Sequence, residues 1–113
     1  MKLVPRIPDF VRSFPEVDIP LRGVRGWMVQ GDAQQVVFIE FSETVEVPEH
    51  SHSEQWEFVV AGWVMLRMQG TSTEYRAGEN FYIPAGVLHS ATVHAGYQAL
   101  ILFNERDRYH IKP

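Results

Sequence analysis

The chain has 113 residues, with 10 Lys and Arg against 14 Asp and Glu, a formal net charge of -4 and 45% hydrophobic residues, as expected for one globular domain. It contains five His and no Cys, so disulfides and thiolate metal sites are excluded, and any metal must bind through nitrogen and oxygen atoms. A negative net charge offers no basic field for phosphates, which argues against nucleic acid and anionic membranes as partners.

Membrane and export signals are missing from the pattern of apolar residues. The longest uncharged apolar run, 58–66, has nine residues, about half of what a membrane-spanning helix needs. The first twenty residues are interrupted by four prolines and contain no apolar signal core. We therefore expect a cytoplasmic protein without a membrane anchor.

Residues 1–25 mix prolines, charges and isolated apolar residues without a helical or a strand period. This pattern predicts an extended arm that lies over the domain and can add an edge strand.

From Trp27 onward, short β-rich runs alternate with turn residues. Glycines at the ends of these runs allow positive φ angles in the turns. The spacing predicts about eight or nine strands and little helix, and hence an all-β jelly-roll barrel over residues 26–104. Residues 105–113 are charged and poor in apolar side chains, which predicts a polar C-terminal tail that is docked on the surface or frayed. The expected strands are 35–41, 45–47, 56–61, 63–68, 71–76, 80–83, 90–93 and 97–103.

Three of the five histidines are candidates for one metal site. His50 and His52 are two residues apart, so on a strand they point to one face about 6.6 Å apart. His89 follows a Pro-Ala-Gly turn sequence, and Gln55 and Glu57 follow His52 at close range. Two or three imidazoles with an oxygen donor form a set that suits a divalent transition metal.

The run from Gly78 to Val93 resembles the second motif of the cupin superfamily, G-x5-P-x-G-x2-H-x3-N. Gly78, Pro84, Gly86 and His89 stand at its anchors, and Val93 replaces the final Asn. The first motif, G-x5-H-x-H-x3/4-E-x6-G, is matched at its two histidines but has Thr44 in place of the leading Gly. The resemblance covers residues 36–103 and implies a small, single-domain, RmlC-like cupin with a double-stranded β-helix barrel.

The fourth ligand implied by the resemblance has two candidates. Counting back from Gly62 with six intervening residues reaches Gln55, whereas counting forward from His52 with four reaches Glu57. We favour Gln55 because the glycine turn fixes the strand register and some small cupins use a glutamine amide oxygen; Glu57 remains the alternative.

Residues 103–109 resemble the closing strand of small cupins that linearise unsaturated uronic acids. In those enzymes an aspartate two residues before the phenylalanine acts with a later arginine, but here that position is Ile101. Without this carboxylate the uronate activity is a minor alternative. Arg106 or Arg108 is a candidate to clamp a ligand carboxylate at the mouth, although we favour a role for both as solvated tail charges.

For the remaining residues we expect structural or solvent-exposed positions rather than roles in the metal site. We expect His94 to be an exposed turn residue and His110 to be solvated. The apolar alternation around Phe58 and Val60 predicts a strand buried on both faces, with one face meeting a second subunit in a homodimer.

The resemblance implies a metal-dependent enzyme that acts on a small oxygen-rich organic molecule by isomerase or cyclase chemistry or by dioxygenase chemistry. One divalent ion (Fe, Mn, Ni, Co or Zn) would be held by His50, His52, His89 and Gln55, with Glu57 as the alternative to Gln55. Glu57 and Glu40 are the weak candidates for a general acid or base. The alternative is a non-catalytic ligand-binding or sensor barrel with a structural metal, and the three histidines argue against an empty barrel.

Overall fold

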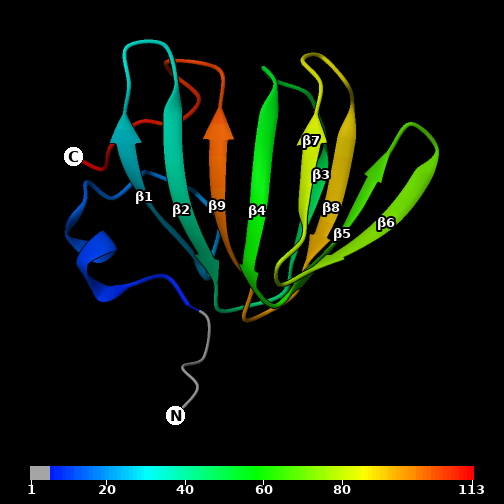
Figure 1. Ribbon diagram of the computed structural model, residues 1–113, viewed down its shortest axis with the longest axis horizontal. Coiled ribbons are helices and arrows are strands. Elements are labelled where there is room, and N and C mark those ends of the chain that lie inside the picture. The colour runs from blue at the N-terminus through cyan, green and yellow to red at the C-terminus, as the bar shows by residue number, and fades with distance from the viewer. Residues whose placement is uncertain (1–5) are drawn as a thin grey trace.

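The computed structural model describes residues 6–113, which form two facing antiparallel β-sheets (Figure 1). One short 3-10 helix precedes nine strands along the chain. The elements are η1 (Asp9–Ser13), β1 (Val24–Gln30), β2 (Gln35–Phe41), β3 (Val45–His50), β4 (Gln55–Ala61), β5 (Trp63–Met68), β6 (Thr71–Arg76), β7 (Asn80–Ile83), β8 (His89–Val93) and β9 (Gln98–Phe103).

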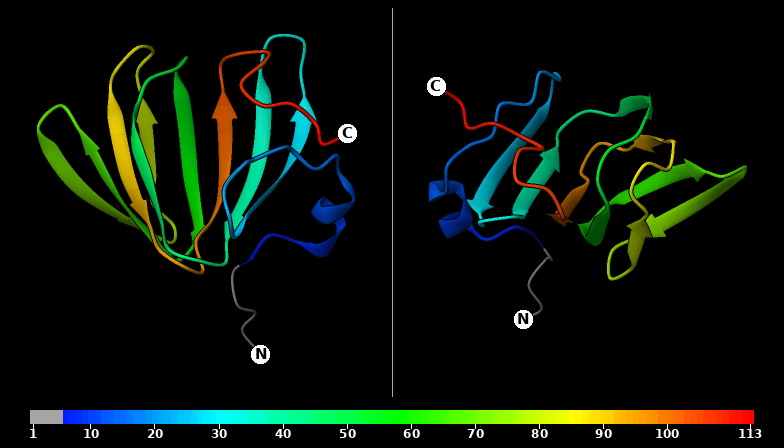
Figure 2. Two further views of the ribbon diagram at one scale, coloured as in Figure 1. Left: turned by 180° about the vertical axis from the view of Figure 1, so that it is seen from behind. Right: turned by 90° about the horizontal axis from the view of Figure 1, so that it is seen from above.

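The strand order identifies the fold. One sheet has the order β1-β2-β9-β4-β7 and the other β3-β8-β5-β6, so successive strands cross repeatedly between the sheets. Figures 1 and 2 show the sheets converging at one end and splayed at the other. The prediction of an all-β jelly roll with eight or nine strands is confirmed, and residues 6–113 contain no α-helix.

The side chains that face between the sheets form the main hydrophobic core. Strand β2 shows why, because Gln35, Val37, Ile39 and Phe41 are all buried and alternate with less buried residues. In β4 the inner residues are buried, whereas Trp56 is exposed and Phe58 is half-buried. The outer face of this strand is therefore only partly buried in the single chain, and it is the face left for the expected second subunit to cover.

The N-terminal segment covers the edge of the larger sheet beside β1 (Figure 1). Ile7 and Val11 pack with the buried Trp27, and Glu16 forms an isolated bridge with Trp27. Residues 1–5 of the predicted arm lie outside the described residues. The described part contains the turn of 3-10 helix η1, which the sequence pattern did not predict, and β1 begins within the range assigned to the arm. Residues 6–113 contain no helix long and apolar enough to cross a membrane.

One glycine turn is tightly constrained by its surroundings. Gly62 connects β4 to β5 with a φ of +73°, and a Cβ placed on it would lie 2.8 Å from the Cα atom of Tyr97. Gly70 connects β5 to β6 with a similar φ of +78°, but nothing lies within 4 Å of its Cβ position. Both turns need the left-handed conformation, and only the turn at Gly62 is pressed against another backbone segment.

We predict that Gly62→Ala destabilises the protein more than Gly70→Ala does. Both substitutions pay about 1–2 kcal/mol for a left-handed alanine, and Gly62→Ala adds about 1–3 kcal/mol because Tyr97 must move. Urea unfolding of the two variants measures the difference in the free energy of unfolding. Equal losses in the two variants would contradict the close contact at Gly62.

Candidate metal centre

Three histidines converge at one end of the space between the sheets. His50 at the end of β3 pairs directly with His89 at the start of β8, and His52 follows in the next loop. The turn before His89 is fastened to this loop, since the N–H of Gly86, with a φ of +75°, donates to the His52 carbonyl at 2.9 Å. One candidate ligand nitrogen from each histidine lies within 4.8 Å of the others. The two sequence motifs thus meet through strand pairing and one backbone hydrogen bond.

Each of these imidazoles is oriented by a backbone carbonyl. The Nδ1 atom of His50 lies 2.9 Å from the Pro48 oxygen, that of His52 lies 2.6 Å from the Ser53 oxygen, and that of His89 lies 2.9 Å from the Val87 oxygen. A carbonyl oxygen only accepts, so Nδ1 carries the proton in each ring and Nε2 keeps its lone pair. This is the tautomer and the outer support that metal-binding histidines use.

The electrostatics also favour neutral rings. Burial lowers the pKa of His52 to about 4, and the positive charge of Arg108 contributes less. The pKa of His89 is lowered chiefly by burial. Both rings therefore carry a free lone pair at neutral pH, and the three-histidine donor set fits a divalent transition metal.

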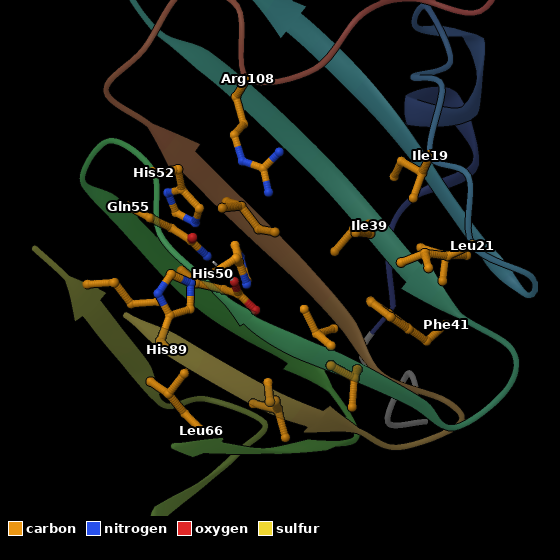
Figure 3. A pocket seen from close by; sticks show the side chains of 18 of the residues that line it. Ile19, Leu21, Ile39, Phe41, His50, His52, Gln55, Leu66, His89 and Arg108 are labelled. Atoms are coloured by element: carbon orange, nitrogen blue, oxygen red, sulfur yellow. Dashed lines mark hydrogen bonds between the residues drawn. The ribbon is translucent and has the colours of Figure 1, made fainter. Parts of the chain in front are cut away.

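Gln55 and Glu57 lie side by side on the buried face of β4. The Gln55 Nε2 donates to Glu57 Oε1 at 2.7 Å, and the Tyr97 hydroxyl donates to Glu57 Oε2. Burial raises the pKa of Glu57 to about 7, against the lowering effect of these two donors. Figure 3 shows Gln55 pointing toward His50 and His52. The two candidates for a fourth ligand are thus parts of one hydrogen-bonded unit.

The histidines line a cavity of about 370 Å³ between the sheets. In Figure 3 the polar side chains His50, His52, Gln55, His89 and Arg108 gather toward one end, and Ile19, Leu21, Ile39 and Phe41 lie toward the other. Sixteen of the 24 lining residues are apolar. A cavity of this size and character holds one small organic molecule.

Other residues singled out in the sequence lie away from the histidines. Glu40 pairs with Arg12 at 2.6 Å on the outer face of β2 and does not line the cavity, so it leaves the set of acid and base candidates. His94 is half-buried and stacks on Trp63 with 3.6 Å between ring centroids, so the expectation of an exposed turn residue is wrong. His110 is exposed, as expected.

The carboxyl group in the cavity wall comes from strand β4 and not from the position on β9 where the uronate enzymes have their aspartate. Ile101 on β9 lines the cavity and leaves no carboxylate at its own position. Its cross-strand partner on β4 is Glu57, so a carboxyl group stands on the neighbouring strand instead.

The C-terminal tail is folded back onto the barrel, which is the docked one of the two expected arrangements. The buried Gln35, 1% exposed, donates from Nε2 to the Tyr109 carbonyl at 2.9 Å and accepts from the Tyr109 N–H at 3.0 Å. Arg108 lines the cavity, whereas Arg106 is exposed and donates to the Asp32 carbonyl. The position of Arg108 depends on a long-range contact, because the neighbouring Tyr109 is held by Gln35, which is 74 residues away in the sequence.

Comparison with known proteins gives matches in sequence family and in structure. Residues 36–103 match the family model described as the cupin domain. An RmlC-like cupin from Shewanella frigidimarina is 25% identical with a TM-score of 0.71, covering 83% of this chain and 86% of that one. KdgF from Halomonas sp. is 18% identical with a TM-score of 0.69, covering 80% of this chain and 87% of that one. A salicylate 1,2-dioxygenase mutant from Pseudoaminobacter salicylatoxidans, in complex with gentisate, is 16% identical with a TM-score of 0.65, covering 75% of this chain and 26% of that one. No curated protein matches this chain.

We predict that Gln35→Ala releases the C-terminal tail, because the substitution leaves the N–H and the carbonyl of Tyr109 without their partners. The expected cost is about 2–4 kcal/mol of unfolding free energy, with faster hydrogen exchange at the backbone amides of residues 107–111. The matched control is Gln34→Ala, which removes an exposed side chain that donates to Asn104; its expected effect is within about 0.5 kcal/mol. Unchanged protection of the tail amides in Gln35→Ala would contradict this role.

Proposed function

The chain belongs to the cupin family, and from this we propose that it is a metal-dependent enzyme that acts on a small oxygen-rich organic molecule. The observation that supports this proposal most is the convergence of three imidazoles, each fixed through Nδ1 by a backbone carbonyl, with their candidate ligand atoms within 4.8 Å. Solvated surface histidines have no reason to share a tautomer and a direction. The proposed ligands of one divalent ion are His50, His52, His89 and Gln55.

Gln55 rather than Glu57 is the proposed oxygen ligand. A carboxylate oxygen accepts hydrogen bonds, so the Glu57 oxygen must face the NH2 group of Gln55, and the amide oxygen is then directed away from Glu57. Both Glu57 oxygens already accept a hydrogen bond, one from Gln55 and one from Tyr97. Glu57 is therefore proposed to hold the amide in the orientation that presents its oxygen.

The chemistry follows from what surrounds the ligands. A divalent ion at this position supplies Lewis-acid chemistry or, as Fe(II), redox chemistry. The apolar walls of the cavity exclude water from a bound molecule, which strengthens polar interactions there. Glu57 is the carboxyl group of the lining and is the proposed group for proton transfer.

The competing function is a ligand-binding or sensor barrel in which the metal only fixes a small acid. The wide apolar cavity is compatible with both functions. A proton NMR time course of metal-loaded protein with small oxo and hydroxy acids separates them. Chemical conversion that is lost in His89→Ala supports the enzyme, and binding without conversion across the panel supports the sensor.

We further propose a homodimer formed through the outer face of the five-stranded sheet. One cross-strand row runs over all five strands there, from Val29 through Val36, Leu102 and Trp56 to Tyr82. Four of these five large side chains are exposed in the single chain. A row of uncharged apolar groups on a sheet face suits a second copy packed about a twofold axis, because each copy offers the same surface.

We predict that metal-free protein binds about one equivalent of Zn²⁺ or Mn²⁺ per chain, and that His89→Ala weakens binding by more than about 100-fold, beyond the effect typical of an outer-shell residue. His94→Ala and His110→Ala are matched controls, because these histidines lie outside the cavity lining. Equilibrium dialysis with elemental analysis measures the bound metal. Metal binding that is absent, or that is lost equally in His94→Ala, would overturn the site.

The same dialysis ranks the two candidates for the oxygen ligand. If Gln55 is the ligand, Gln55→Ala weakens binding more than Glu57→Gln does, and Glu57→Gln has at most the roughly 10–100-fold effect of a group that orients a ligand. The reverse ranking would identify Glu57 as the ligand.

For the dimer, we predict a light-scattering mass of twice the 13.0 kDa chain mass at micromolar concentration. Trp56→Glu places a charge in the centre of the apolar row and is expected to yield monomers with unchanged circular dichroism. Phe10→Glu alters an exposed apolar residue on η1 that is not part of the row, and it should leave the dimer intact. A monomeric wild-type protein would overturn this proposal.

A further inference from the structure

A positively charged side chain without a partner faces the cavity. Arg108 lines the cavity from the C-terminal tail, and its Nε atom is buried without any hydrogen-bond partner. Within residues 6–113 the guanidinium group of Arg108 forms no ion pair and donates no hydrogen bond. Each of the other arginines forms at least one such interaction. A buried donor of this kind is costly unless a ligand satisfies it.

The position of this guanidinium is fixed in advance. Its Cζ atom lies 4.5 Å from the ring centroid of Tyr109 and 5.4 Å from that of Phe103. The peptide of Tyr109 is in turn clamped on both sides by Gln35. In Figure 3 the group projects from the tail into the cavity, on the same side as His52. Little side-chain entropy therefore remains to be lost when an anion binds.

The neighbouring groups do not neutralise this charge. Glu57 is the acidic residue of the lining, and both its oxygens are taken by Gln55 and Tyr97 rather than by Arg108. The charge of Arg108 instead contributes to keeping His52 and His89 neutral. An anionic ligand is thus the missing partner, and a carboxylate matches the planar fork of a guanidinium.

The rest of the cavity constrains the body of such a ligand. The end away from the histidines is formed by Ile19 and Leu21 of the N-terminal segment and by Ile39 and Phe41 of β2 (Figure 3). None of these side chains can hydrogen-bond to a ligand hydroxyl. Each hydroxyl buried there without a partner would cost about 1–3 kcal/mol, so a polyhydroxylated body is disfavoured and a hydrocarbon body is favoured.

We propose that the ligand of this cavity is a carboxylic acid with an apolar body, whose carboxylate pairs with Arg108 and whose hydrocarbon part lies against the Ile19, Leu21, Ile39 and Phe41 wall. This deepens the function proposed above by naming its substrate class. Arg108 is then a specificity-determining residue, and the folded-back tail is the element that supplies it.

Calorimetric titration with octanoate and with its neutral counterpart octanamide tests the carboxylate contact, first in metal-free protein. We expect octanoate to bind the wild type about 10–100-fold more tightly, as for a charge-assisted pair. Arg108→Met should remove this preference, and Arg108→Lys should retain part of it. The control Arg106→Met changes the exposed arginine and should retain the full preference. Equal binding of acid and amide by the wild type, or a preference that survives in a folded Arg108→Met, would overturn the proposal.

A chain-length series from butyrate to octanoate tests the apolar wall. Affinity should rise roughly fourfold per added methylene while the cavity fills, and glucuronate should bind more weakly than hexanoate. A flat series, or tighter binding of glucuronate, would overturn the apolar body.

Repeating both titrations after Zn²⁺ loading keeps the two proposals separate. An Arg108-dependent preference in a protein that binds no metal would leave this inference standing without the metal centre. Metal binding without an Arg108-dependent preference for the acid would support the metal centre and overturn this inference.

Discussion

The site depends on the pairing of β3 with β8, which places His50 directly opposite His89. The loop that carries His52 is held next to this strand pair because the Gly86 N–H donates a hydrogen bond to the His52 carbonyl. Every imidazole then finds a backbone carbonyl for its Nδ1 atom, so the three rings are oriented by main-chain geometry alone. A site held in this way is preorganised, because backbone atoms that already belong to strands and turns lose no further freedom when a ligand binds.

The buried carboxylate inside the barrel has its hydrogen-bonding capacity satisfied by neighbouring side chains. Glu57 accepts from Gln55 and from Tyr97, and all three of these residues line the same cavity as the histidines. A buried polar network of this kind is stabilising only while every member is satisfied. Arg108 is the exception, because its Nε atom has no partner within the described chain. The contrast between a satisfied carboxylate and an unsatisfied guanidinium is the physical basis of the anionic ligand proposed for this cavity.

The two ends of the cavity have different origins in the chain. The polar end is built from β3, β4, β8 and the C-terminal tail, and the apolar end receives Ile19 and Leu21 from the segment before β1. Both terminal segments are joined to each other by the bridge between Val17 and Ile111 and by the hydrogen bond from Asp18 to the His110 carbonyl. The two ends of the cavity therefore include segments that lie outside the region matched by the cupin family, 36–103.

The sequence by itself determined the strands from β2 to β9, the barrel and the three candidate histidines, whereas β1 was not among the expected strands. Alternating burial and glycine turns are local properties, and the second motif has a fixed spacing that places His89 after the Pro84 turn. Only the tertiary structure showed that Gln55 donates a hydrogen bond to Glu57. It also showed that Glu40 lies on the outer face, paired with Arg12, and that His94 stacks on Trp63. It also determined that the C-terminal tail docks on the barrel. The sequence left open whether residues 105–113 are docked or frayed, because Gln35, the partner of Tyr109, lies on a distant strand, and a hydrogen bond between residues 74 positions apart leaves no periodic pattern in the sequence.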